Sequence, residues 1–309
     1  MLLPATAQHR KLSATLQIPC MSRPPCGLVE FEDGYAIGSY SGSVTHISTT
    51  GSNAQQTRTI VSCSLQNAPV TALAAGHKLY CSFRNGEIAI GDRISMKLDS
   101  AFLTSLHAMG PNAYELVVAS TSRGMVTIYD PSKNVFVHTM PIYSDASRHF
   151  RLCSSHAAVL PTFGCICAAC EDIISVVDAR IGRKTPCLEL RFKRYADSPT
   201  RGTTVTRLAA LPWGGVLAGT SSSAIHLLDL SSAHPEEVAD TVLCHPGPIK
   251  DMSACKTTLV SGSARRLTSH VLVGKEIRPQ SSTDLDSILC GLCPSAAVLA
   301  NRTIVSASQ

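Results

Sequence analysis

Two cysteine groups have spacings that are typical of zinc ligands. The first group is Cys165-x-Cys167-x-x-Cys170, and the second is Cys290-x-x-Cys293. A structural zinc site needs four ligands that converge, commonly from turns. The first group instead lies on a strand-like run, so Cys165 and Cys167 point to the same face and Cys170 lies at the following turn. We therefore predict no metal site and interpret these cysteines as buried packing residues.

The side chains that serve in nucleophilic or acid–base catalysis show no catalytic pattern. The sequence contains no Gly-x-Ser-x-Gly turn, no segment with paired carboxylates and no glycine-rich phosphate loop. Four histidines, His156, His226, His245 and His270, stand isolated in the sequence. Because a lone histidine beside a strand is usually packed or hydrogen-bonded, we predict no catalytic residue, no cofactor and no enzyme activity.

The densest positive charge lies between residues 180 and 201, where seven basic residues face two acidic ones. Such a segment can contact phosphates by salt-dependent electrostatic attraction, and it can equally be a solvated loop. Both interpretations stay open. The candidate contacts with a partner or with RNA are Arg180, Arg183, Lys184, Arg191, Lys193, Arg194 and, in a later segment, Arg265.

The composition indicates a folded, mildly basic protein. The 309 residues are 44% hydrophobic and 16% charged, with a formal net charge of +5. Ample apolar material and few charges exclude an intrinsically disordered chain. No run reaches the roughly 18 apolar residues of a membrane span, and the first ten residues do not form a signal peptide. The 13 scattered cysteines, in a chain too large to need disulfides, indicate reduced thiols in an intracellular protein without a membrane partner.

One hairpin pattern recurs along the chain. Each copy has two small residues, a turn of about three residues, a polar or glycine position and then alternating apolar residues. The six copies are residues 38–47, 81–92, 119–130, 167–178, 218–229 and 260–270. The turn glycines are Gly42, Gly86 and Gly124, which favour the backbone angles of a tight turn.

Four copies end on an aspartate. Asp92, Asp130, Asp178 and Asp229 lie 38, 48 and 51 residues apart, which brackets the about 40–45 residues of a four-stranded propeller blade. We predict that these aspartates cap tight turns through hydrogen bonds to the backbone. A further apolar segment precedes several copies and predicts the innermost strand of a blade: residues 70–73, 102–106, 205–208 and 249–252.

The two ends of the chain supply a seventh blade. Three predicted strands near the C-terminus are residues 288–292, 296–300 and 303–306. Residues 12–18 alternate cleanly and have no partner nearby in sequence. A propeller removes its exposed edge when one terminus completes the blade of the other. We therefore predict an all-β, seven-bladed propeller, closed by the N-terminal strand in the last blade. It forms one domain over residues 1–309, in which residues 1–10 are a candidate for disorder. A β-sandwich is the alternative, but sandwiches do not repeat one hairpin at this period.

The hairpins resemble WD repeats in general. Gly91, Tyr129, Val177 and Leu228 take the place of the tryptophan in the Trp-Asp pair, and the single tryptophan, Trp213, lies elsewhere. This resemblance covers nearly the whole chain. It implies a WD40-type propeller that acts as a non-catalytic scaffold for protein–protein interaction.

A narrower resemblance covers roughly residues 165–275. In order and spacing, five motifs are similar to those of the WD-repeat assembly factors of the large (60S) ribosomal subunit: residues 170–180, 183–192, 205–212, 247–252 and 262–270. The chain departs from that family at Cys170, Asp172, Ser263 and Ala264. The resemblance implies a ribosome biogenesis factor, in the nucleus and nucleolus, that acts in large-subunit assembly and rRNA processing. It implies pre-60S assembly factors and an AAA-type ATPase as partners, with rRNA as a further contact.

Other functions stay open. The chain can be a scaffold subunit of another intracellular complex, with a cytoplasmic location, because function resides in rim residues carried by a common fold. A phosphoinositide-binding propeller would carry a Phe/Leu-Arg-Arg-Gly motif, and the closest segment, Arg191–Tyr195, lacks the glycine. A diphthine methyl-ester hydrolase would need a polar, water-activating cluster, which the sequence alone does not locate.

Overall fold

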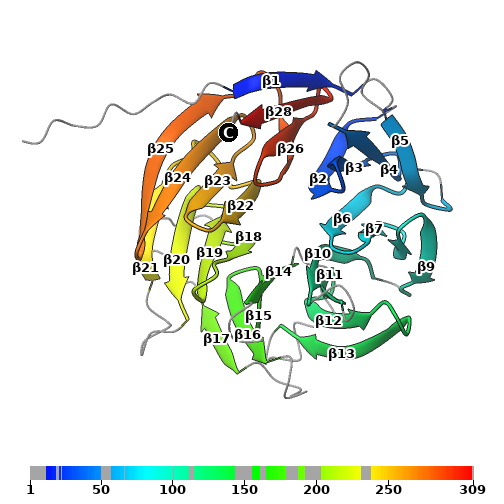
Figure 1. Cartoon of the computed structure of the whole chain (residues 1–309). Helices are drawn as coiled ribbons and strands as arrows, with labels where there is room; N and C mark the ends of the chain where they lie inside the picture. Colours follow the sequence, from blue (N-terminus) through cyan, green and yellow to red (C-terminus); the bar gives the residue numbers. More distant parts are fainter. Residues whose placement is uncertain are drawn as a thin grey trace, which may run out of the picture.

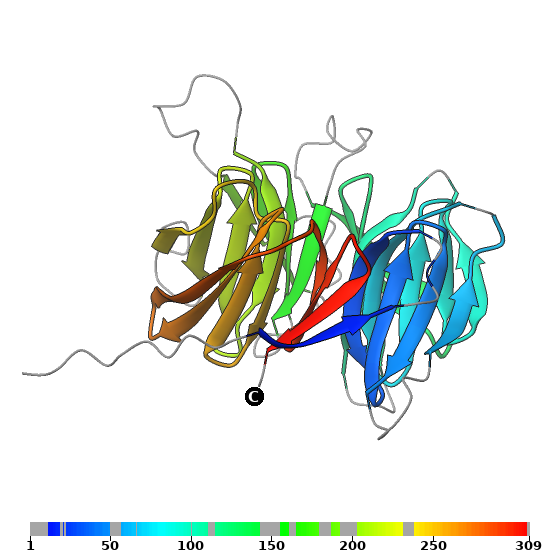
Figure 2. The ribbon, with the colours of Figure 1, turned by 90° about the horizontal axis from the view of Figure 1, so that it is seen from above.

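The computed structural model describes residues 12–18, 21, 23–49, 57–65, 67–99, 101–110, 115–142, 155–160, 165–178, 187–191, 203–230 and 238–307. Within these residues the chain forms seven antiparallel sheets of four strands each. Figure 1 shows the sheets set radially, as blades, around a central opening, and Figure 2 shows the same ring edge-on. The prediction of an all-β, seven-bladed propeller is confirmed. This described part contains no helix that could cross a membrane.

In blades 1 to 6 the four strands follow one another in sequence. Blades 1 to 3 comprise β2 (Pro25–Phe31), β3 (Gly34–Ser39), β4 (Ser43–Ser48) and β5 (Thr57–Ser62); β6 (Val70–Ala75), β7 (Leu79–Phe83), β8 (Glu87–Ile90) and β9 (Arg93–Lys97); and β10 (Leu103–Met109), β11 (Leu116–Thr121), β12 (Met125–Asp130) and β13 (Val135–Pro141). Blades 4 to 6 comprise β14 (Ser155–Leu160), β15 (Cys165–Cys170), β16 (Ile173–Asp178) and β17 (Leu188–Arg191); β18 (Val205–Ala210), β19 (Gly215–Thr220), β20 (Ala224–Asp229) and β21 (Val238–Leu243); and β22 (Asp251–Cys255), β23 (Thr258–Gly262), β24 (Arg266–Val273) and β25 (Glu276–Asp284).

Blade 7 joins the two ends of the described chain. It contains β26 (Leu289–Leu292), β27 (Ala296–Leu299), β28 (Thr303–Ala307) and, on its outer side, β1 (Leu12–Gln17). The Gln17 side-chain amide donates to the Thr303 hydroxyl (3.0 Å), and the Ile18 amide donates to the Arg302 carbonyl (2.9 Å). Figure 1 shows β1 beside β28 at the seam of the ring.

Apolar residues fill the spaces between neighbouring blades. The described residues form seven buried clusters, one for each pair of adjacent blades. Between blades 3 and 4, Val126 and Ile128 pack with Ile166 and Ile173. Tyr129, on the other face of the same strand, packs in the cluster between blades 2 and 3. The predicted alternation of residue type is present, but both faces of the strand are buried because each blade has a neighbour on both sides.

The first strand of each blade lines the central channel. β6 and β18 contain the predicted innermost segments 70–73 and 205–208, β10 and β22 overlap the predicted segments 102–106 and 249–252, and residues from all four strands face the channel. The pairing of β6, β10 and β18 with the next strand shifts by one residue at a β-bulge, which increases local twist. β10, β14, β18 and β22 end at the same face of the ring, here named the mouth face.

The predicted turn glycines have the backbone angles that tight turns require. The angle φ is +83° at Gly42, +86° at Gly86 and +68° at Gly124. In blade 3 the Gly124 amide donates to the Thr121 carbonyl (3.1 Å), and the Gly124 carbonyl accepts from the Ile142 amide (2.9 Å). Residues with a Cβ rarely adopt positive φ, so glycine determines the shape of these turns.

Three of the four closing aspartates occupy the predicted position. Asp130, Asp178 and Asp229 are the last residues of β12, β16 and β20, and all three are buried. The Asp130 carboxylate accepts hydrogen bonds from the backbone amides of Ser132 (2.9 Å) and Lys133 (3.3 Å). The predicted capping of a turn is therefore confirmed at Asp130.

Asp92 differs from the other three. It lies two residues beyond β8, its side chain is 77% exposed, and its one ion pair, to Arg93, is 3.8 Å long. The cause is Gly91, whose φ of +62° turns the chain before the strand reaches the aspartate. The Gly91 amide donates to the Leu79 carbonyl (2.8 Å), which continues the pairing of β7 and β8 as far as Gly91.

Candidate functional site

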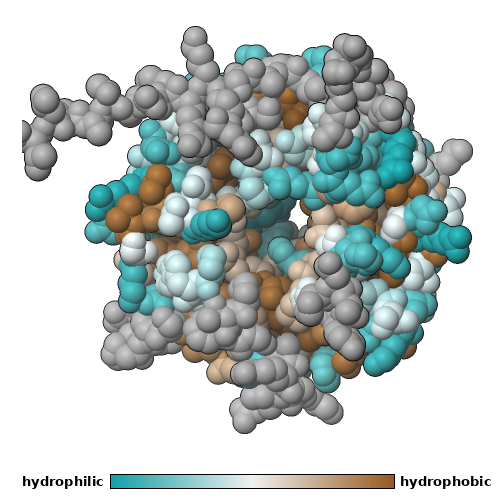
Figure 3. All heavy atoms as spheres, in the orientation of Figure 1, coloured by the Kyte–Doolittle hydropathy of each residue, from teal (hydrophilic) through white to brown (hydrophobic). Residues whose placement is uncertain are grey.

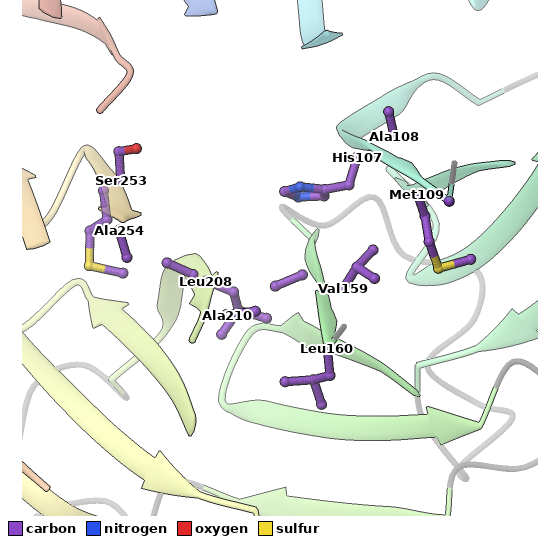
Figure 4. Close-up of a pocket in the computed structure, with 13 residues that line it drawn as sticks. His107, Ala108, Met109, Val159, Leu160, Leu208, Ala210, Ser253 and Ala254 are labelled. Atoms are coloured by element: carbon purple, nitrogen blue, oxygen red, sulfur yellow. The ribbon is translucent and has the colours of Figure 1, made fainter. Parts of the chain in front are cut away.

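A hollow of about 680 Å³ opens where the channel meets the mouth face. Its wall consists of the last residues of β10, β14, β18 and β22, from four successive blades. Most of the lining side chains are apolar, including Met109, Val159, Leu160 and Leu208 (Figure 4). Figure 3 shows the central channel open, with pale and brown residues along part of its wall. We name this hollow the channel mouth.

Four polar side chains form a belt inside the channel, adjoining the mouth. They are His107 on β10, His156 on β14, Arg207 on β18 and Asp251 on β22. Arg207 Nε donates to Asp251 Oδ1 (3.0 Å), and Arg207 Nη1 lies 3.4 Å from His156 Nε2. Asp251 Oδ2 accepts from the Leu292 amide of blade 7 (2.8 Å). The belt therefore joins blades 4 to 7 through hydrogen bonds.

The imidazoles of the belt are neutral near pH 7. Burial lowers the pKa of His156 well below its usual value, and electrostatic interaction first with the charge of Arg207 and then with the His107 ring lowers it further. Burial also lowers the pKa of His107. A neutral imidazole offers one donor and one acceptor, while Arg207 and Asp251 balance each other's charge. The mouth is thus an apolar hollow with a neutral polar floor, which suits a partner's side chain better than a phosphate.

Two hydroxyls precede His107 on β10, and both are hydrogen-bonded. Ser105 is hydrogen-bonded to the Ser120 hydroxyl (2.6 Å) and accepts from the Ala157 amide (3.0 Å). The Thr104 hydroxyl donates to the Ser120 carbonyl (3.2 Å). These hydrogen bonds connect the inner strand of blade 3 to β11 and to blade 4.

Two histidines that the sequence analysis treats as isolated are brought together in blade 6. His245 Nε2 lies 2.8 Å from the Ser261 hydroxyl, and His270 Nε2 lies 2.9 Å from the same oxygen. Burial raises the pKa of the neighbouring Cys244 thiol to about 11. Both histidines are hydrogen-bonded, as the sequence analysis expects, and they share a partner because the loop after β21 folds back over β23. The paired strands β23 and β24 could have indicated half of this contact, but the loop could not be placed from sequence.

Cys244, His245 and His270 form one of two groups of described residues with the chemistry of a metal site, the other being Glu32, Asp33 and His46. Within each group the ligand atoms lie within 4.8 Å of one another. The Nε2 atoms of His245 and His270 both bond to the Ser261 hydroxyl, while the buried Nδ1 atoms of the two rings have no hydrogen-bond partner among the described residues.

The cysteine groups singled out by spacing do not form a ligand cluster within the described residues. Cys167 and Cys170 are buried in apolar surroundings, and burial raises the pKa of Cys167 to about 12. Cys293 packs in the cluster between blades 7 and 1. The residues lie where packing cysteines are expected.

The predicted basic contacts fall largely outside the described residues. These are Arg180, Arg183, Lys184, Lys193 and Arg194, together with the side chain of Arg191 at the end of β17. Arg265 is exposed in the turn between β23 and β24. Because β23 starts at the mouth face and runs away from it, Arg265 lies at the opposite end of blade 6 from the channel mouth.

Comparisons with known proteins identify the fold. No protein-family model matches the sequence, and no curated protein matches it significantly. The fold is similar to the WD40 β-propeller domain of Doa1, with a TM-score of 0.71, 13% identity and coverage of 96% of both chains. It is also similar to the WD40 repeats of RRP9, with a TM-score of 0.70, 12% identity and coverage of 95% of this chain and 97% of that chain. A chain of the mitotic checkpoint complex is similar as well, with a TM-score of 0.72, 13% identity and coverage of 99% of this chain and 96% of that chain. At these identities the likeness shows a WD40-type β-propeller fold.

Proposed function

We propose that the protein is a non-catalytic docking scaffold that holds a protein partner at the channel mouth. The observation that carries this proposal is the hollow of about 680 Å³ at the ends of four inner strands, apolar at its wall and neutral at its floor. Pockets of this size, lined by apolar groups with a few convergent polar ones, are typical of binding sites. The similar fold in a chain of the mitotic checkpoint complex supports a place in a multi-protein assembly.

We propose further that this assembly is a precursor of the large ribosomal subunit. The support is the sequence resemblance over residues 165–275 to WD-repeat assembly factors of that subunit. Under this proposal the chain acts in rRNA processing in the nucleolus, and its partners include pre-60S factors and an AAA-type ATPase. The segment with Arg180, Arg183 and Lys184 would contact rRNA through salt-dependent attraction to phosphates.

Affinity purification of the tagged full chain, with bound proteins and RNA identified, tests both levels of the proposal. We expect assembly factors and precursor rRNA with the wild type. The Ser253→Glu variant places a charge in the mouth and should lose protein partners while its circular dichroism stays unchanged. Reversal of Arg183, Lys184 and Lys193 to glutamate should lose RNA. Recovery of an unrelated complex would support the scaffold proposal and contradict the ribosomal assignment. Recovery of no partner would contradict both.

The polar belt gives one specific reason to weigh hydrolysis as a second candidate. His156, Arg207 and Asp251 are side chains that a water-activating site uses, and the structure gathers them although the sequence did not locate them. A hydrolase predicts measurable cleavage of methyl-ester substrates that His156→Ala abolishes. A scaffold predicts no turnover by either chain.

A further inference from the structure

A second hollow, of about 340 Å³, lies on the mouth face between blades 5 and 6. Three turns supply most of its lining: Trp213 follows β18, Lys256 and Thr257 follow β22, and Gly274 and Lys275 follow β24. Asp229, at the end of β20, and Leu272, in β24, complete it. We name it the rim hollow. Unlike the channel mouth, it combines an aromatic ring with cations.

The two hollows are joined by the same stretches of chain. Ala210 lines the channel mouth and lies three residues before Trp213, while Ala254 lines the mouth and lies two residues before Lys256. Both stretches run outward from the end of an inner strand to the following turn. A ligand with an extended backbone can therefore reach both hollows at once.

The rim hollow has an excess of positive charge. The buried Asp229 carboxylate, 4% exposed, forms an ion pair with Lys275 (2.5 Å) and cancels its charge. The neighbouring Glu276 is engaged by Arg278 (2.6 Å). Lys256 is exposed and forms no ion pair with any described residue. The net charge presented to a ligand is therefore that of Lys256.

The indole of Trp213 is held in place on one face. It lies against Gly215, where an added Cβ would come within 2.4 Å of indole Cη2. The side chain is 36% exposed, so part of the ring still meets solvent beside Lys256. A fixed, half-exposed indole next to a free ammonium group binds an amphipathic ligand at low entropic cost.

Resting on the proposed function, we propose that the partner binds through an extended acidic peptide segment that spans both hollows. An apolar side chain of the segment occupies the channel mouth, and a carboxylate one or two residues away binds Lys256 beside the Trp213 indole. Single-stranded RNA fits less well, because its phosphates would meet an apolar wall and neutral imidazoles at the mouth. Charge complementarity at the rim and apolar lining at the mouth together specify the peptide.

The single tryptophan of the chain provides the test, because any change in tryptophan emission reports on the rim hollow. The probes are a ten-residue peptide with one leucine flanked by four glutamates, the same peptide with glutamines, and a uridine 15-mer. We expect saturable change in Trp213 emission with the acidic peptide alone. Lys256→Glu should weaken its binding about tenfold or more. Lys78→Glu, an exposed lysine in the equivalent turn of blade 2, is the matched control and should change nothing.

Three outcomes would overturn the inference: equal binding of the glutamine peptide, an equal effect of the two lysine variants, or quenching by the uridine 15-mer without a response to the peptide. Affinity purification separates this failure from that of the proposed function. If partners are lost with Ser253→Glu but retained with Lys256→Glu, the scaffold proposal is supported and the binding of an acidic segment at the rim hollow is contradicted. An absence of partners in every chain would remove the scaffold itself.

Discussion

Blade 3 and blade 6 have the same four-stranded sheet, but different interactions hold their middle hairpins. In blade 3 the hairpin turns at Gly124, with φ of +68°, and the second strand ends on Asp130, which caps the next turn. In blade 6 the corresponding turn, residues 263–265, contains no glycine, and no aspartate ends β24. The local chemistry that marks the repeat in blade 3 is therefore missing from blade 6.

Blade 6 replaces that local chemistry with contacts between distant segments. Ser261 joins His245, from the loop before the blade, to His270 in β24. Its outer hairpin is longer, since β24 and β25 have eight and nine residues, against six and seven for β12 and β13. The comparison teaches that one blade is fixed mainly by its turns and the other by buried polar contacts. The two should fail under different changes.

The largest effect is expected from Gly124→Val in blade 3. Valine resists positive φ, and holding it there costs about 3 kcal/mol. Thermal unfolding of the variant should begin at a clearly lower temperature than in the wild type. Gly247→Val is the control, because a Cβ at Gly247 would meet nothing within 4 Å and its φ is not positive. Equal melting of the two variants would show that the turn does not stabilise blade 3.

Ser261→Ala should have the next largest effect, in blade 6. The change leaves a ring nitrogen of the buried His270 and one of the half-buried His245 without their hydrogen-bond partner, at a cost of about 2 kcal/mol. Denaturant unfolding at pH 7 measures the loss. Ser253→Ala serves as the control, since no hydrogen bond of the Ser253 hydroxyl to a described residue is seen. If Ser261→Ala and Ser253→Ala have equal free energies of unfolding, the network does not stabilise blade 6 and serves only to favour this packing over others.

These two blades also show what the sequence could reveal. Turn glycines, small residues and strand periodicity are local, so the hairpins, the inner strands and the capping by Asp130 could be predicted. The network of blade 6 depends on how a loop packs over a strand, which no local pattern encodes. The early turn of blade 2 could have been predicted from Gly91, because a glycine before the closing aspartate permits positive φ.

The sequence contains a pattern that indicates the polar belt of the channel. His107, His156, Arg207 and Asp251 lie 49, 51 and 44 residues apart, close to the period of a blade. His107, Arg207 and Asp251 lie in or just after a segment predicted to be innermost, while His156 lies in β14, for which no such segment was predicted. Polar residues that recur at blade spacing on inner strands must meet around the axis. Their hydrogen bonds, by contrast, depend on the height of each strand in the channel and required the structure.

A smaller effect, a gradual loss of stability as the pH falls, is expected in blade 6. Burial, with a further contribution from the charge of Arg266, lowers the pKa of His245 to about 4, and burial followed by His245 does the same for His270. An unfolded histidine has a pKa of about 6.5. The unfolded chain therefore binds more protons between pH 6.5 and 4, so stability falls as pH falls through this window. Unfolding midpoints measured at pH 7 and pH 5 should differ less in a His245→Gln, His270→Gln double variant than in the wild type. An unchanged difference would assign the acid sensitivity to other groups, such as His156.

The smallest effect is expected at the aspartates that close the repeat, and it tests whether the repeat position or the local contact matters. Asp130→Ala removes the acceptor of the Ser132 and Lys133 amides and should lower the Tm by about 2 °C, whereas Asp92→Ala should change it by less than about 1 °C. Hydrogen bonds from Ser132, then from Lys133, hold the pKa of Asp130 below its usual range. Its contribution is present above the ordinary carboxyl pKa and is lost below about pH 4. The difference between the two variants should therefore disappear in acid, in a window below that of the blade 6 histidines. Equal and pH-independent changes in the Tm of Asp130→Ala and Asp92→Ala would instead mean that both aspartates act through their place in the repeat. The contrast between a blade stabilised by its turns and one stabilised by buried contacts would then no longer hold.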